Sequence, residues 1–244
     1  MDGSVAGNGV TGFRVGNDGT LTPIPDSFRA LSSPIAVPGV VTFSPNGSSH
    51  IVTGKVANFI DVFQVRENGL LSMPKHNRAA PDGRRTFAAT FRDDGRLLTV
   101  ESGLPVLNNA GVSSYDLDRA TQSLSVITNS AKNRQTDSCW IVITDDQQYA
   151  YTANFSSGTI SSYRLGTGGR AALIDKADFF MGGKSEPTDL AFSSGSRYLY
   201  NLLRGTGGVA AFEVQQDGTL KSLGVFGVGQ ALPIADGASG LAAY

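Results

Sequence analysis

Polar side chains follow four apolar segments that recur along the chain. The segments end at Gly54-Lys55, Glu101-Ser102, Asn154-Phe155 and Leu203-Arg204. Glu101 is the one carboxylate in this set, and partial burial after the apolar run 97–100 would raise its pKa toward that of a general base. Lys55 and Arg204 suit a carboxylate or phosphate, and Asn154 can donate to a carbonyl oxygen. The set predicts attack of water on a carbonyl group, with Glu101 as the catalytic base.

Two loops between the repeated segments add a second cation and a second carboxylate. Arg85 follows Arg84 in one loop, and Asp137 lies in the next. We expect Arg85 to stabilise the developing oxyanion and Asp137 to bind substrate. The alternative is that all of these side chains are solvated residues without a catalytic role. Glu101 and Asn154 alone are too few ligands for a calcium site, and one cysteine and two histidines offer no zinc spacing, so we expect neither a metal nor a cofactor.

The elements that carry these residues repeat. One short phrase occurs five times, as GVTGF, FIDVF, GVSSY, TISSY and GVAAF, and ends at Phe13, Phe63, Tyr115, Tyr163 and Phe212, at intervals of 50, 52, 48 and 49 residues. Each copy alternates in the period of two that is typical of a β-strand. Turns containing Asn-Gly or Asp-Gly follow three of the copies and indicate hairpins. The final aromatic residues of the last four copies, Phe63, Tyr115, Tyr163 and Phe212, are expected to occupy equivalent packing positions.

A second phrase precedes the first in each repeat, as VVTFSPNG, AATFRDDG, WIVITDD and DLAFSSG. One repeat therefore holds four strands, here called A to D, which is the composition of a β-propeller blade. A β-sandwich has strands of similar length but gives no reason for a four-strand unit to recur. We predict one all-β propeller domain over residues 1–244: a partial blade (1–32), four antiparallel blades (33–80, 81–133, 134–183, 184–235) and a closing strand (236–244). That is about five blades of a seven-bladed ring, truncated at its N-terminus, with almost no helix.

Composition excludes several classes of protein. The 20 lysines and arginines balance 21 acidic residues, so the net charge of −1 argues against nucleic-acid binding. No apolar window reaches the ~20 residues of a membrane span, and the first residues lack a signal-peptide pattern. We expect a soluble, cytoplasmic protein that does not bind membranes. Open blade edges would leave backbone groups unpaired, so self-association through them is expected.

These phrases resemble the seven-bladed propeller lactonase family, which includes 6-phosphogluconolactonase-like and carboxymuconate-lactonizing-enzyme-like proteins. The resemblance is carried by VTGFRVGNDGTLTPIP, NFIDVFQV, GVSSYDLD, CWIVITDDQQYAYTANFSSGTISSYRL and DLAFSSGSRYLYNLL, and by the closing GASGLAAY. It implies a propeller fold and hydrolysis of a small lactone, such as a sugar lactone or a carboxylated lactone. The alternative is a non-catalytic propeller that binds a protein or small ligand on its face, because the entries to strand A contain no histidine.

Overall fold

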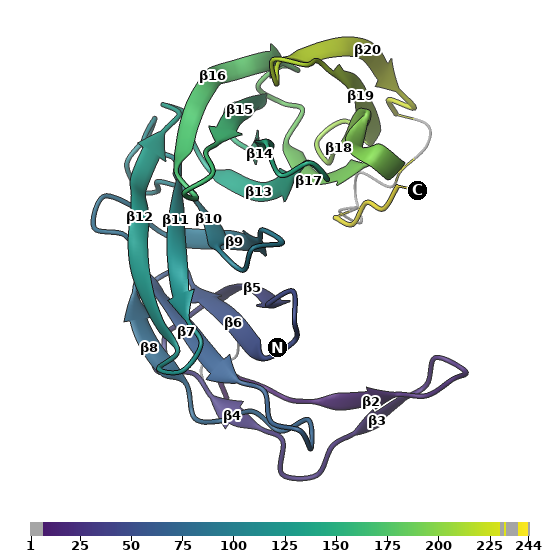
Figure 1. The fold of residues 1–244 in the computed structure, drawn as a ribbon. Helices are drawn as coiled ribbons and strands as arrows, with labels where there is room; N and C mark the ends of the chain where they lie inside the picture. The colour runs from purple at the N-terminus through teal and green to yellow at the C-terminus, as the bar shows by residue number, and fades with distance from the viewer. Residues whose placement is uncertain (1–6, 230–231, 233–238, 244) are drawn as a thin grey trace.

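The computed structural model describes residues 7–229, 232 and 239–243, and it is a β-propeller in which four antiparallel sheets of four strands follow one another around an arc (Figure 1). In chain order the strands of these sheets are β5 (Pro38–Phe43), β6 (Ser49–Gly54), β7 (Phe59–Gln64), β8 (Lys75–Arg78); β9 (Thr86–Phe91), β10 (Leu97–Glu101), β11 (Gly111–Asp118), β12 (Ser123–Lys132); β13 (Ser138–Ile143), β14 (Tyr149–Asn154), β15 (Thr159–Leu165), β16 (Ala171–Phe180); and β17 (Pro187–Phe192), β18 (Tyr198–Leu203), β19 (Gly208–Val214), β20 (Leu220–Phe226). Strand A of each blade (β5, β9, β13, β17) lies on the concave side of the arc.

Helix is nearly absent, as the glycine content predicted. Within the described residues the helical structure is one 3-10 turn, Ser194–Ser196. No helix in this part of the chain is long and apolar enough to cross a membrane.

The N-terminal segment forms a hairpin beside the first blade. β1 (Gly9–Val10) pairs with β4 (Arg29–Ala30), and β2 (Phe13–Val15) pairs with β3 (Leu21–Pro23). All four strands lie within the predicted partial blade, residues 1–32. The predicted closing strand lies partly outside the described residues, and residues 239–243 contain no strand.

Apolar side chains between adjacent blades form the core. The four aromatic residues that end the repeated phrases within the blades, Phe63, Tyr115, Tyr163 and Phe212, are all fully buried, which confirms the prediction. Phe212 packs edge-to-face on Phe179 of the preceding blade, with ring centroids 5.1 Å apart. Tyr115 and Tyr163 likewise lie in clusters of apolar residues that include members of the preceding blade, such as Ile51 beside Tyr115 and Leu98 beside Tyr163.

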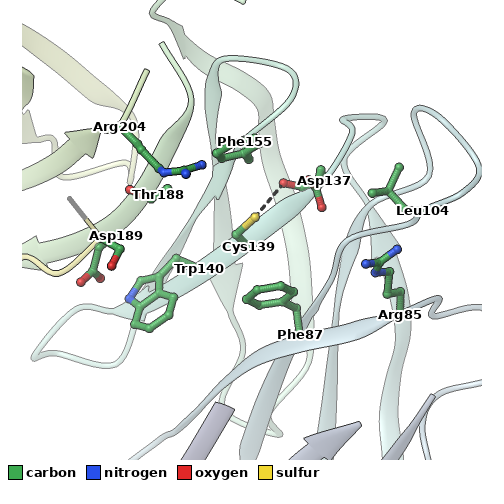
Figure 2. Close-up of a pocket in the computed structure, with 11 residues that line it drawn as sticks. Arg85, Phe87, Leu104, Asp137, Cys139, Trp140, Phe155, Thr188, Asp189 and Arg204 are labelled. Carbon is green, nitrogen blue, oxygen red and sulfur yellow. Dashed lines mark hydrogen bonds between the residues drawn. The ribbon is translucent and has the colours of Figure 1, made fainter. Parts of the chain in front are cut away.

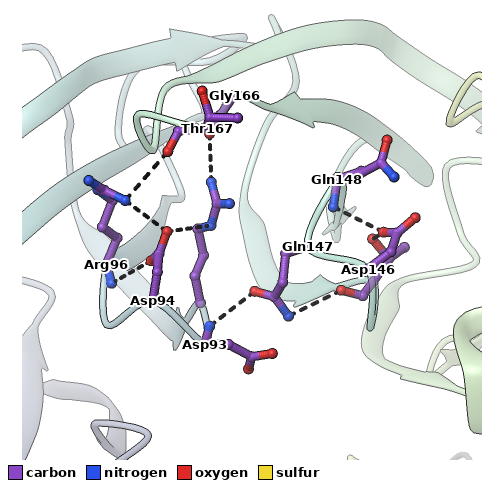
Figure 3. Close-up of polar contacts among 10 residues, drawn as sticks. Asp93, Asp94, Arg96, Asp146, Gln147, Gln148, Gly166 and Thr167 are labelled. Atoms are coloured by element: carbon purple, nitrogen blue, oxygen red, sulfur yellow. Dashed lines mark hydrogen bonds and ion pairs between the residues drawn. The ribbon is translucent and has the colours of Figure 1, made fainter.

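Turns between strands A and B join successive blades at the end opposite the site described below. The backbone N–H of Asp93 donates to Oε1 of Gln147 (3.1 Å), and the N–H of Asp145 donates to Oγ of Ser196 (2.9 Å). Arg92 also reaches the carbonyl of Gly166, and Arg92 and Arg96 both pair with Asp94 (Figure 3).

The corresponding link is missing between the first two blades. The residue equivalent to the donors Asp93 and Asp145 is Pro45, which has no N–H. The residue equivalent to the acceptors Gln147 and Ser196 is Gly95, which has no side chain. At the other end of these two blades, Oγ1 of Thr53 donates to the carbonyl of Phe87 (2.5 Å), and the Asn58 amide contacts Gly83 and Thr86. The two blades are also joined at their outer strands, where the Asn77 side chain of β8 donates to the carbonyl of Gln122 (3.1 Å) and accepts the N–H of Leu124 (2.9 Å).

Candidate functional site

One backbone device is repeated where each strand A begins. The residue before it has a left-handed conformation in all four blades: Val37 (φ 44°), Arg85 (φ 58°), Asp137 (φ 59°) and Glu186 (φ 49°). Its carbonyl accepts a hydrogen bond from the residue that follows strand B of the same blade: Lys55 (3.1 Å), Ser102 (3.2 Å), Phe155 (2.9 Å) and Arg204 (3.1 Å). We call these four couples, Val37/Lys55, Arg85/Ser102, Asp137/Phe155 and Glu186/Arg204, the entry pairs. They set equivalent positions of different blades at one end of the propeller.

The entry pairs border a cavity of about 470 Å³. It is lined by residues of the second, third and fourth blades and one C-terminal residue: Arg85, Phe87, Leu104, Asp137, Cys139, Trp140, Phe155, Thr188, Asp189, Arg204 and Ser239. Figure 2 shows the rings of Trp140 and Phe87 in the middle of this set, with Arg85 and Asp189 on opposite sides. Its size is within the range of ligand pockets.

Glu101 does not line this cavity. It is the last residue of β10 and is fully buried, and its carboxylate accepts hydrogen bonds from Oγ1 of Thr99 (3.2 Å) and Oγ of Ser130 (3.1 Å). Burial raises the pKa of the Glu101 carboxyl above its ordinary value. The predicted burial is present, but it encloses the carboxylate among strands β10 and β12 and away from the cavity.

Asn154 is buried in the same way at the end of β14. Its side-chain oxygen accepts hydrogen bonds from Ser138 and Asn133, and its amide nitrogen donates to Thr159 (2.9 Å) and Ser161 (2.8 Å). Both of its polar atoms are satisfied inside the blade. Neither Glu101 nor Asn154 is among the lining residues of the cavity.

Strand register explains this outcome. Glu101 pairs with Thr86 and Asn154 with Ser138, as Gly54 pairs with Pro38 and Leu203 with Pro187. These are the last positions of strand B, whereas the entry pairs use the next residue. The sequence-based set combined the two: Lys55 and Arg204 belong to entry pairs, and Glu101 and Asn154 to the positions before them.

Arg85 and Asp137 do line the cavity, and their charges interact. Burial raises the pKa of the Asp137 carboxyl above its ordinary value, while the charges of Arg85 and Lys55 act in the opposite direction. Beside it, Sγ of Cys139 donates to the backbone carbonyl of Asp137 (3.2 Å), and burial raises the pKa of the thiol to about 12. Cys139 is therefore a neutral wall residue at neutral pH, and Asp137 is the group that can accept a proton.

Lys55 and Arg204 lie at the border. Nζ of Lys55 sits 4.4 Å from the centroid of the Phe87 ring, and its pKa is lowered by burial and then by the Arg85 charge. It lines an adjacent cavity of about 390 Å³ that shares Arg85 and Leu104 with the first. Arg204 is half exposed and pairs with Glu186 at 3.8 Å. The structure thus brings Arg85, Asp137 and Arg204 to one cavity and Lys55 to its neighbour.

Sequence reasoning did not select three further lining residues, Phe87, Trp140 and Asp189. Asp189 is buried, and its oxygens accept the N–H groups of Leu190 and Leu241, both at 2.8 Å. A signal was present, because all three lie in the first residues of a strand A, beside the left-handed entry residues.

A metal site is not evident at this cavity. No group of three or more histidine, cysteine, aspartate or glutamate side chains could hold an ion in the part of the chain that the structure describes.

The fold and the cavity define a β-propeller with a polar and aromatic site at one end of its blades. The family model "Lactonase, 7-bladed beta-propeller" matches residues 51–178, more than half of the chain. The chain belongs to this lactonase family. No curated protein matches it.

Solved structures of similar fold include three proteins of this kind. A putative 6-phosphogluconolactonase from Bacteroides fragilis is 20% identical, with a TM-score of 0.72, over 89% of this chain and 64% of that one. A putative 6-phosphogluconolactonase from Bacteroides uniformis is 19% identical, with a TM-score of 0.73, over 93% of this chain and 67% of that one. The periplasmic gluconolactonase of Pseudomonas aeruginosa is 19% identical, with a TM-score of 0.70, over 91% and 65%. The chain spans about two thirds of the length of these proteins.

Proposed function

We infer that the protein opens the ring of a small lactone in the cavity beside the entry pairs. The observation that carries this proposal is the meeting of Arg85, Asp137 and Arg204, from three successive blades, around one cavity in a chain of the lactonase family. Lactone hydrolysis requires a base for water and a positive group for the oxyanion. The cavity holds two carboxylates and two cations. Both oxygens of Asp189 already accept backbone N–H groups, so we assign the base to Asp137 and the oxyanion group to its neighbour Arg85.

Asp137 and Arg85, together with water, account for every proton transfer and charge in the proposed reaction. The Asp137 carboxylate accepts a proton from water as the water oxygen bonds to the lactone carbonyl carbon, and Arg85 stabilises the negative charge on the carbonyl oxygen. When the tetrahedral intermediate collapses, the bond to the ring oxygen breaks, and that oxygen takes the proton from Asp137. Arg204 binds a polar group at the other side of the cavity. The base role that sequence reasoning gave to Glu101 falls to Asp137 in this proposal, because Glu101 does not reach the cavity.

Lactone hydrolysis with an Asp137 variant tests the proposal. In a pH-stat assay over a panel of lactones, Asp137→Asn should lower kcat by ~10²- to 10⁴-fold, the usual contribution of a positioned base. Asp93→Asn is the matched control, because Asp93 is an exposed aspartate of the turn between β9 and β10, outside the cavity. An unchanged rate in Asp137→Asn would remove this residue from the mechanism.

A non-catalytic propeller is the second candidate. It is favoured by the cavity lining, which includes no histidine among the described residues and whose thiol is held protonated. Ligand binding without turnover on any lactone of the panel would support it.

A further inference from the structure

The charges that line the cavity determine which kind of lactone it can bind. The inference drawn from them rests on the proposed function. Two cations, Arg85 and Arg204, and two carboxylates, Asp137 and Asp189, line the cavity, so the formal charges of the lining cancel. The neighbouring cation Lys55 is not a lining residue, and its Nζ is engaged over the Phe87 ring at 4.4 Å. Arg204 is further engaged by Glu186 at 3.8 Å. A phosphorylated ligand needs cations that are free to make charge-assisted hydrogen bonds. Here it would also meet the carboxylates of Asp137 and Asp189.

The centre of the cavity is apolar. The rings of Phe87, Trp140 and Phe155 line it together with Leu104, and the thiol of Cys139 is neutral. Figure 2 shows Trp140 and Phe87 between the charged residues at its two sides. Aromatic faces bind apolar groups, and a charged group placed against them without a partner would lose its hydration.

Hydrogen bonds hold the chain at each of the two carboxylate residues. Asp189 is held by the N–H groups of Leu190 and Leu241, and Asp137 belongs to an entry pair whose carbonyl accepts the N–H of Phe155 (2.9 Å). The backbone that carries these negative groups is therefore tied down at the cavity wall. An anionic ligand would have to be accommodated beside them.

We propose that the cavity selects uncharged lactones with an apolar body, such as alkyl-substituted δ-lactones, over phosphorylated or polyhydroxylated sugar lactones. The lactone carbonyl faces Arg85 and Asp137, and the alkyl or ring carbons lie against Phe87 and Trp140. Selectivity comes from the apolar centre and from the carboxylates that repel an anion.

Intrinsic fluorescence reads this site directly, because Trp140 is the single tryptophan of the chain. The full chain is titrated with δ-decalactone (uncharged and apolar), glucono-δ-lactone (uncharged and polyhydroxylated) and 6-phosphogluconate (anionic). We expect δ-decalactone to bind with a Kd at least about 10-fold below those of the other two, a difference of about 1.4 kcal/mol. Tighter or equal binding of 6-phosphogluconate or glucono-δ-lactone, or no response of Trp140 to any of the three, overturns the inference.

Variants separate the two causes of selectivity. Phe87→Ala should weaken δ-decalactone binding about 10-fold, while Phe43→Ala, at a half-exposed ring of β5 outside the cavity, should change it less than about twofold. Asp137→Asn should tighten 6-phosphogluconate binding and so narrow the difference in Kd between 6-phosphogluconate and δ-decalactone. Equal effects of Phe87→Ala and Phe43→Ala, or no gain in anion binding, would contradict the inference.

Hydrolysis is followed separately in the same samples. If δ-decalactone binds tightly and stays intact, the proposed function fails and the ligand preference stands. If glucono-δ-lactone is turned over with a higher kcat/KM than δ-decalactone, the proposed function stands and the inferred preference is overturned.

Discussion

Removing the ring of Phe212 should measure how strongly the third and fourth blades are held together. Phe212 of β19 is fully buried, and its ring meets Phe179 of β16 edge-to-face at 5.1 Å. Truncation to alanine removes about 150 Å² of buried apolar surface, which corresponds to about 4 kcal/mol at 25 cal/mol per Å². The lost aromatic contact adds to this value and relaxation of the neighbours subtracts from it. We expect Phe212→Ala to lower the free energy of unfolding by about 3–5 kcal/mol.

Urea denaturation followed by circular dichroism measures this loss, with the slope of the transition compared between variants. The matched control is Phe180→Ala, because Phe180 is the neighbour of Phe179 and is 64% exposed. Its effect should stay within about 0.5 kcal/mol. Phe212→Leu, which retains part of the volume, should fall between the two. A loss below about 1 kcal/mol in Phe212→Ala, at an unchanged slope, would refute the packing argument.

Two further predictions concern titrating groups. Burial raises the pKa of Glu101 in the folded state, so its contribution to stability is present below the unfolded pKa and is lost as pH rises through the folded pKa. Above the ordinary glutamate pKa, the urea midpoint of the wild type should fall as pH rises, and Glu101→Gln should make this fall smaller. An equal fall of the midpoint in the two proteins would contradict this prediction. In the proposed reaction, kcat/KM should fall at low pH as Asp137 becomes protonated, and this acid limb should lie above the ordinary aspartate pKa. Arg85→Ala should move the limb to higher pH, because it removes a charge that lowers the Asp137 pKa. An acid limb that stays in place or moves to lower pH would show that Arg85 does not act on the base.

The blades were predictable because their evidence is periodic. The phrases that end at Phe63, Tyr115, Tyr163 and Phe212 recur in register, and burying one aromatic ring in each blade satisfies the same packing requirement four times. The turns with Asn-Gly or Asp-Gly mark the hairpins independently of this packing. Fold class therefore followed from local pattern alone.

The site was predicted in part, because it depends on a difference of one residue. Glu101 and Ser102 are adjacent, and only the second belongs to an entry pair; the first turns into the blade toward Ser130. In this blade neither of the two lines the cavity, whereas Phe155 and Arg204, the residues equivalent to Ser102 in the next two blades, do line it. Arg85 and Asp137 occupy a conformation that glycine favours, and nothing in their residue type indicates it.

The asymmetric joint between the first two blades has a mechanical consequence. At one end these blades are fastened by Thr53 and Asn58, whereas at the turn end Pro45 and Gly95 can make no bond of the kind that Gln147 and Ser196 make farther along. The A-to-B turns of these two blades can therefore move apart without breaking a hydrogen bond between them, while Asn77 still ties β8 to β12. Lys55 would keep its place over Phe87 during such a movement, because both lie at the fastened end.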